Sequence, residues 1–446
     1  MATSSQAPLA DVIAEYRSTG VSSAARRDWL VRLANDGRAA ALATFAELVA
    51  SDPPASVEDV LVAFAPLLRK PSALPVEALF PRLLDATVHL SVAAIVLDVA
   101  NHYVRTGRLR PHPANDRSAK LAALFESVAI RLEKLPKTPP GDAAEWEAQR
   151  RAAEEGFALL ISLCDTLALV GDRSVCDPLR AALDLPHRRL RTEVAAALAR
   201  LGQSDGIDAL AQMTAEPVVR TRAIAYLEEL GLGDQVPAEY RSAIARAEGQ
   251  LAQWLAAPLQ FGIGPHEIEL VDRRTQSWPG FDEPVECFLF RYAYRAGQGE
   301  LAGIGIVGPL VYAAPCGADE LGVDDLYALF AGYHAEHESI GETPFAEAPG
   351  VERGMVEALV RELGEDYAEV VPVAVGRFFG ERHIVFTATR NGGRGTLVLD
   401  AGEPHWYAAG DLRSPLGATQ AYQIHKGRKL LRAFNAVEKA SDATAE

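Results

Sequence analysis

Apolar residues in the first third of the chain recur at intervals of three and four positions, the period of an amphipathic helix. Trp29, Leu30 and Leu33 show this spacing, and it returns within 42–49 and 121–132. Prolines interrupt it near positions 53, 71 and 111, where each is suited to end one helix before the next begins. The pattern predicts an α-helical domain at 1–134, which could include degenerate helical repeats.

A proline-rich stretch divides the helical half of the chain. Pro136, Pro139, Pro140 and Gly141 cannot continue a helix, so we expect a linker at 135–143. Helical spacing resumes beyond it, and a second helical region is expected at 144–257.

Three similar segments lie within this second helical region. Each ends in a glycine, and Gly171, Gly202 and Gly231 are separated by about 30 residues, the period of a two-helix repeat. One helix pair cannot bury its apolar face alone, whereas stacked pairs share a continuous core. The glycines are expected where a helix ends in a left-handed turn.

With this spacing the sequence resembles bacterial HEAT repeats, of the type also found in phycobilisome-lyase proteins, over about residues 157–232. The resemblance implies an all-α solenoid whose extended concave surface binds a protein partner. Because solenoids host many unrelated roles, it does not identify that partner.

Arginines gather in two of the repeat units, and two interpretations stay open. They could pair with acids of neighbouring repeats, such as Asp184, Asp205 and Asp208. Alternatively, they could bind a partner. That partner could be a nucleic acid, held in an anion-binding groove similar to that of the HEAT-like DNA glycosylases. The partner-binding candidates among them are Arg188, Arg189, Arg191, Arg220 and Arg222.

Alternation with a period of two replaces the helical spacing in the second half. Phe288, Phe290, Tyr292 and Tyr294 fall on one face of a strand predicted at 285–294. The uncharged run that follows is predicted to pair with it as a hairpin. Further elements are expected as a helix at 323–340 and strands at 368–375, 382–389, 395–400 and 406–409.

These elements predict a multidomain chain, an all-α HEAT-like solenoid followed by an α+β domain with a mainly antiparallel sheet at 258–435. A flexible tail is expected at 436–446, where the residues are small and polar.

Glycines at 303, 305 and 308 spell the G-x-G-x-x-G pattern of dinucleotide-binding loops. Pro309 and Pro315 follow within β-prone residues, so no phosphate-binding helix can begin there. We interpret the glycines as sites of close strand packing. The same prolines and glycines argue against a transmembrane helix in the uncharged stretch 301–318.

Histidines on the predicted helix 323–340 are the most specific candidate for a metal-binding site. Two imidazoles three residues apart can hold one metal ion, with a carboxylate or a distant histidine completing the set. The spacing matches neither H-E-x-x-H nor H-x-x-E-H, so a core histidine with solvated neighbours is the plainer interpretation. The candidate metal ligands are His334, His337, Glu338 and His383.

A second aromatic and polar group is His405, Trp406 and Tyr407, which could form the rim of a binding surface or part of a strand's core. These three residues are therefore also candidates for binding a partner.

Charge and cysteine content narrow the functional classes. The formal net charge of −16 disfavours nucleic acid and anionic membranes as partners. The four cysteines form no C-x-x-C pair, and the first residues lack the features of a secretory signal, so a reducing, cytoplasmic location is expected.

We therefore expect a cytoplasmic protein-interaction or scaffold protein that needs no cofactor. A metal-assisted hydrolase or lyase, with its site on the helix 323–340, is the first alternative. Nucleic-acid binding through the arginines is the second.

Overall fold

The computed structural model describes residues 9–18, 22–69, 74–134, 142–257, 263–296, 299–314, 321–409 and 416–435. Most of the expected linker, the expected tail and Cys316 lie outside these ranges. The chain divides into two compact units, the first Met1–Ala215 with Arg222–Val236, and the second Glu216–Thr221 with Pro237–Glu446.

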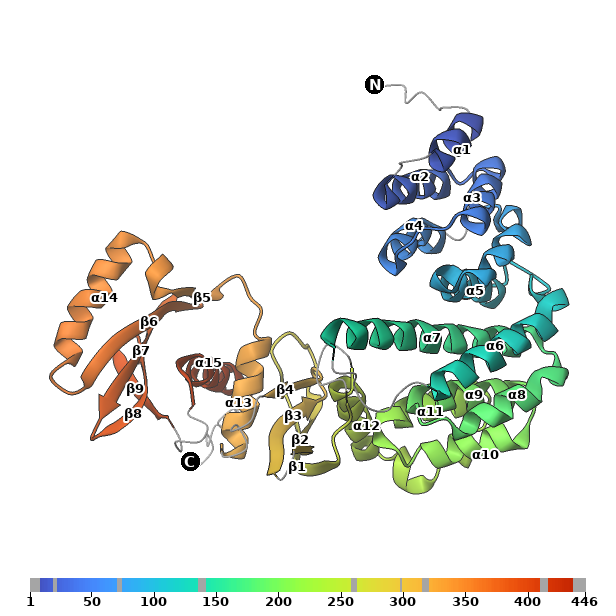
Figure 1. The fold of residues 1–446 in the computed structure, drawn as a ribbon. Coiled ribbons are helices and arrows are strands. Elements are labelled where there is room, and N and C mark those ends of the chain that lie inside the picture. The colour runs from blue at the N-terminus through green and yellow to red at the C-terminus, as the bar shows by residue number, and fades with distance from the viewer. Residues whose placement is uncertain are drawn as a thin grey trace, which may run out of the picture. The chain divides into compact units, whose positions relative to one another are not determined.

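The first unit is helical, and its helices pack in two layers (Figure 1). In one layer α2, α4, α5, α7 and α9 pack successively, while α3, α6 and α10 each pack against a member of that series. A single core of buried side chains runs through the unit from Val12 to Leu201. The helices are α1 (Leu9–Arg17), α2 (Ser23–Asp36), α3 (Ala39–Ser51), α4 (Val57–Arg69), α5 (Leu90–Arg105), α6 (Ser118–Glu133), α7 (Ala143–Val170), α8 (Cys176–Ala181), α9 (Arg188–Arg200) and α10 (Ser204–Met213). The next helix, α11 (Pro217–Glu229), belongs to the first unit from Arg222 onward.

The glycines of the repeat pattern occupy equivalent corners. Gly171 follows α7, Gly202 follows α9 and Gly231 follows α11, each directly or within two residues of the helix end. All three have left-handed backbones, with φ of 78°, 76° and 71°. Glycine adopts this conformation without the penalty that a Cβ would bring. The predicted helical repeats are therefore confirmed.

The second unit contains two antiparallel sheets. Sheet A has the order β1-β2-β3-β4 and sheet B the order β5-β6-β7-β8-β9. The strands are β1 (Glu267–Gln276), β2 (Val285–Ala296), β3 (Gly299–Val307), β4 (Tyr312–Ala314), β5 (Ile340–Pro344), β6 (Ala368–Phe378), β7 (Glu381–Arg390), β8 (Gly393–Asp400) and β9 (Glu403–Ala408). The predicted α+β region with antiparallel sheets is confirmed, although the structure has two sheets instead of one.

Helices cover both faces of each sheet. The predicted aromatic face of β2 packs on Leu251 and Leu255 of α12 (Ala243–Leu255), a helix that the sequence places with the repeats. The opposite face of sheet A packs on α13 (Val323–His334). Sheet B packs on α14 (Gly350–Leu363) with one face and on α15 (Ala418–Phe434) with the other.

The order helix, four strands, helix occurs twice in this unit, as α12-β1-β2-β3-β4-α13 and α14-β6-β7-β8-β9-α15. The two closing helices pack against each other through glycines. A Cβ on Gly332 of α13 would lie 2.1 Å from the Gln423 carbonyl oxygen, and one on Gly427 of α15 would lie 1.7 Å from that of Ala328. These reciprocal contacts place α13 and α15 together between the two sheets.

The glycines of the G-x-G-x-x-G pattern lie in β3 and directly after it, and no helix starts there. A Cβ on Gly305 would meet Leu251 at 2.6 Å, and one on Gly308 would meet the Glu286 carbonyl oxygen at 2.1 Å. The structural interpretation of this pattern is confirmed.

Candidate functional site

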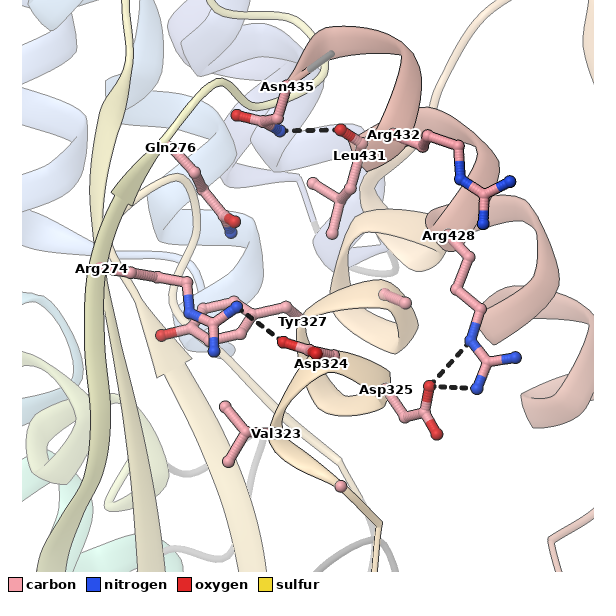
Figure 2. A pocket seen from close by; sticks show the side chains of 12 residues that line it. Arg274, Gln276, Val323, Asp324, Asp325, Tyr327, Arg428, Leu431, Arg432 and Asn435 are labelled. Carbon is pink, nitrogen blue, oxygen red and sulfur yellow. Dashed lines mark hydrogen bonds and ion pairs between the residues drawn. The ribbon is translucent and has the colours of Figure 1, made fainter. Parts of the chain in front are cut away.

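A polar pocket opens beside the α13–α15 pair (Figure 2). Its volume is about 620 Å³, and its lining includes side chains of β1, α13 and α15. Arg274 of β1 pairs with Asp324 at 2.9 Å, and Arg428 of α15 pairs with Asp325. Two of the pocket's cations are thus neutralised by acids of α13, so its wall is a set of ion pairs that tie the three elements together.

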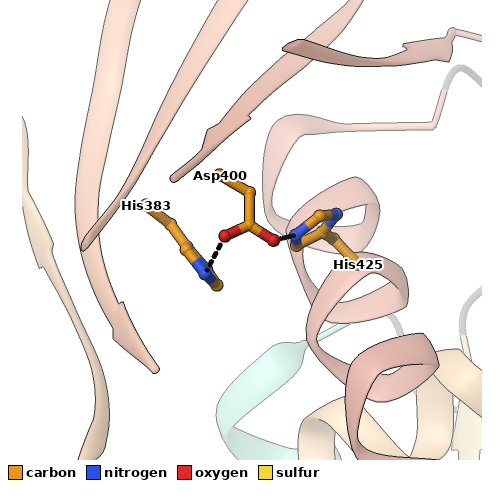
Figure 3. A group of neighbouring side chains, drawn as sticks. All are labelled: His383, Asp400 and His425. Carbon is orange, nitrogen blue, oxygen red and sulfur yellow. Dashed lines mark hydrogen bonds and ion pairs between the residues drawn. The ribbon is translucent and has the colours of Figure 1, made fainter. Parts of the chain in front are cut away.

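A buried group of ionisable side chains lies between sheet B and α15 (Figure 3). His383 begins the inward-facing part of β7, Asp400 ends β8, and His425 lies on α15. All three are buried, and the paired strands β7 and β8 place His383 directly opposite Asp400.

The Asp400 carboxylate is the centre of this group. Its Oδ1 lies 2.9 Å from His383 Nε2, and its Oδ2 lies 3.0 Å from His425 Nε2. The Lys429 ammonium lies 2.8 Å from Oδ2 and 3.1 Å from Oδ1. The carboxylate therefore accepts hydrogen bonds from two imidazoles and one ammonium, which satisfies a buried charge that would otherwise be costly.

Tyrosine hydroxyls bond the far side of each imidazole. Tyr407 Oη lies 2.9 Å from His425 Nδ1, and Tyr422 Oη lies 3.4 Å from His383 Nδ1. If each Nε2 donates its proton to Asp400, each Nδ1 is left to accept from a tyrosine. The hydrogen-bond pattern assigns this tautomer to both histidines.

Burial sets the charge of the group. It lowers the pKa of His425 to about 4 and lowers that of His383 as well. Burial alone would raise the pKa of Asp400, but the hydrogen bonds from Lys429 and the histidines outweigh it and hold that pKa below its usual value. At neutral pH the group is one Asp–Lys ion pair flanked by two uncharged imidazoles.

Lys429 connects this buried group to the surface. Its side chain is 28% exposed and also bonds Glu381 at 2.7 Å. An adjoining open pocket of about 360 Å³ is lined by Phe378, Phe379, Glu381, Lys429, Arg432 and Ala433.

The structure does not bring the predicted metal ligands together. Helix α13 ends at His334 instead of Ile340, because Ala335 turns into extended backbone and residues from Ile340 pair with β6. His334 accepts a hydrogen bond from the Trp278 indole at 2.9 Å. His337 therefore lies beyond the helix, and the prediction that this helix continues to residue 340 is wrong.

His337 and Glu338 lie in the connection to β5, where the His337 ring is 5.0 Å from that of Phe379. Among the described residues, His383 is the one predicted ligand that lies in a group able to hold a metal ion. Its partners there are Asp400 and His425, which were not predicted as ligands from the sequence.

His383 itself is fully buried, whereas alternation along its strand suggests an exposed or rim position. The face it shares with Val385 is covered by α15, a helix absent from the sequence-based expectations.

His405, Trp406 and Tyr407 lie on β9, an edge strand of sheet B. Trp406 packs beside Tyr367 at 5.7 Å between ring centres, whereas His405 and Tyr407 approach His425. All three are half-buried, and Trp406 points to the opposite face from its neighbours, so they do not form one continuous rim.

The repeat arginines differ in exposure. Arg188 and Arg189 are exposed and Arg191 is half-buried, all at the start of α9. Arg220 is buried and pairs with Glu248 at 2.6 Å, so it offers no surface to a partner. Arg222 pairs with Glu193 at 2.7 Å. The acids that pair with these two arginines are glutamates, not the aspartates expected from sequence.

Sequence reasoning missed Asp400, His425, Lys429 and Tyr422, and it named Tyr407 only as a partner-binding candidate. A usable signal was present, because Tyr422, His425 and Lys429 recur at the helical spacing of three and four. Such a stripe of polar residues is ordinarily exposed, and only the position of Asp400 on a neighbouring strand explains its burial.

Comparison with known proteins supports the helical part of the chain alone. No curated protein and no solved structure matches the sequence. Within the described residues, no helix has the length and apolar character needed to cross a membrane. Residues 147–230 match the family model of HEAT repeats, so this segment is a HEAT-repeat region.

Proposed function

We propose that the protein is a cytoplasmic interaction or scaffold protein whose helical repeats bind a protein partner, with the α+β unit as a second recognition surface. The HEAT-repeat region supports a role in protein binding, since stacked helix pairs present extended surfaces. The observation that carries the proposal is an exposed apolar face on α4.

Helix α4 is apolar on two sides. Val60, Phe64 and Leu67 point into the core of the first unit and are fully buried or nearly so. Leu61 and Val62 are 52% and 50% exposed, and Val57 and Leu68 are also exposed.

Val57, Leu61 and Leu68 recur at intervals of four and seven, so they form one stripe along the helix. Helix α4 belongs to the packed series from α2 to α9. Stacked helices of a solenoid present an extended surface, and an exposed apolar stripe on such a surface is typical of a partner-binding site.

Charge supports a protein over a nucleic acid as the partner. The chain has a formal net charge of −16, and Arg220 and Arg222 are already paired with glutamates. Phosphate binding would require cations that are free to replace counterions. The nucleic-acid alternative therefore has less support than a protein partner.

The cysteines favour the cytoplasm. Cys164, Cys176 and Cys287 are free and buried, and burial raises the pKa of the Cys287 thiol to about 11. Cysteines left as unpaired thiols are typical of a reducing compartment, in which disulfides are rare.

The proposal is tested by capture of partners from native extract on the full chain, followed by binding of each purified partner. Leu61→Asp places a charge on the apolar stripe of α4, and Val62→Asp places one on the exposed side of this helix about 100° away from the stripe. Both side chains are half-exposed, so neither variant touches the core. Ile130→Asp is the matched control, because Ile130 is 44% exposed on α6, which lies outside the packed series from α2 to α9.

We expect a direct partner whose affinity falls at least about tenfold with Leu61→Asp, equivalent to about 1.4 kcal/mol, and is unchanged with Ile130→Asp. Equal affinity for all variants would refute binding through α4.

A further inference from the structure

The buried group of His383, Asp400 and His425 has the composition of a transition-metal site. One ligand atom from each of the three residues lies within 4.8 Å of the other two. Zinc binds imidazole nitrogen and carboxylate oxygen at about 2.0–2.2 Å, so ligand atoms in a tetrahedral site lie about 3.3 Å apart. Small rotations of these three side chains would bring all three donors around one ion.

The group also has the supporting contacts that metal ligands need. A histidine bound through Nε2 normally donates its Nδ1 proton to a neighbouring oxygen, which fixes the ring. Tyr407 Oη and Tyr422 Oη are already placed beside the two Nδ1 atoms. Both rings are held from behind by hydroxyls that can accept as well as donate.

Lys429 supplies the positive charge of the group in this structure. Its ammonium lies within 3.1 Å of both Asp400 oxygens and 3.5 Å from His383 Nε2, near the place that a cation would take. The side chain has a second anionic partner in Glu381 and an open pocket beside it. It can therefore leave Asp400 without losing its own counter-charge.

We propose that His383, Asp400 and His425 bind one divalent transition-metal ion of the Zn²⁺ class, in exchange for the Lys429 ammonium. The ion replaces the lysine on Asp400, and Lys429 turns to Glu381 and the pocket. Each imidazole keeps its single proton, which moves from Nε2 to Nδ1, so binding requires no net loss of protons from the ligands.

Three protein ligands leave a fourth position at the ion, on the side that Lys429 vacates. Two imidazoles and one carboxylate suit Zn²⁺ and Fe²⁺, whereas Mg²⁺ and Ca²⁺ prefer oxygen ligands. The site is therefore expected to bind Zn²⁺ and not to bind Mg²⁺ at the same concentration.

The test uses the full chain, stripped with a chelator and titrated with Zn²⁺ against a chromophoric competitor, and with Co²⁺ for its visible absorption. A parallel anaerobic titration uses Fe²⁺. We expect one Zn²⁺ per chain and the intense visible bands of low-coordinate, nitrogen-bound Co²⁺.

His383→Gln and His425→Gln should each lower Zn²⁺ affinity by about 100-fold or more, since even supporting contacts contribute 10- to 100-fold. Glutamine can still donate to Asp400, which preserves the fold. Lys429→Met should raise the affinity, because the competing ammonium is gone.

His266→Ala is the matched control. His266 belongs to a different, exposed group with Glu267 and Glu300, so its loss should not change binding. Absence of stoichiometric Zn²⁺ or Fe²⁺ binding, binding that is lost with His266→Ala, or binding by Lys429→Met alone would each overturn the proposal. The last result would show that Lys429 holds the position permanently.

Discussion

Replacing Gly427 with alanine should destabilise the packing of α15 on α13. A Cβ at this position would lie 1.7 Å from the Ala328 carbonyl oxygen and 2.5 Å from its carbon. Ordinary contact requires about 3.4 Å or more, so the two helix backbones must separate. The overlap is with backbone, and no side-chain rotation can relieve it.

Two effects of opposite sign decide the magnitude. Alanine is favoured over glycine in a helix by about 1 kcal/mol. Overpacking a well-filled interface costs about 1–3 kcal/mol, and more where backbone must move. Since both helices lie between the sheets, we expect a net loss of about 1–3 kcal/mol in the free energy of opening α13 and α15.

Gly354→Ala is the control, because Gly354 is an exposed residue of α14 and a Cβ there would have no other atom within 4 Å. It should stabilise α14 by up to about 1 kcal/mol. Native-state hydrogen exchange, read peptide by peptide, measures both changes without assuming that the two units unfold together. Unchanged or stronger protection of α13 and α15 in Gly427→Ala would refute the close helix contact.

Three further perturbations follow from the polar contacts. Burial lowers the pKa of His112 to about 4, so protonation of this histidine favours the unfolded state. The free energy of unfolding of the first unit should therefore fall by up to about 3 kcal/mol between pH 6.5 and pH 4. Urea unfolding at each pH should show a smaller dependence of this free energy on pH in His112→Gln. Glu193→Gln should lower the free energy of unfolding by about 1–3 kcal/mol, because Glu193 is buried and accepts hydrogen bonds from Arg222 and Tyr226. Glu147→Gln is the control, and it should leave the melting temperature unchanged because the ion pair of Glu147 is exposed. Tyr407→Phe should cost about 1 kcal/mol by removing the hydroxyl bonded to His425, and an unaltered melting curve would contradict that bond.

Local patterns in the sequence were sufficient for much of the fold. The left-handed corners at Gly171 and Gly202 follow from spacing alone, and alternation along β2 identifies the face that packs on α12. Asn-Gly is a typical signal for a tight turn between two strands, and Asn391 and Gly392 form the turn that joins β7 to β8, with φ of 52° and 78°. Each of these features depends on a few neighbouring residues.

Features that depend on distant partners could not be predicted in the same way. The helix that begins at Val323 ends at His334 because residues 340–344 pair with β6, and nothing within the helix specifies that stop. Lys426 and Lys429 belong to a basic segment of the sequence, yet Lys426 is buried beside Tyr422 and Lys429 bonds Asp400. Their environment is set by strands far away in the chain.

Hydrogen exchange of the full chain with and without a purified partner tests the central claim most directly. The account predicts that binding protects the exposed face of α4, with slower exchange across Val57–Arg69 and its packed neighbours α2 and α5. Protection confined to residues 263–435, with the first unit unaffected, would contradict binding through the helical repeats.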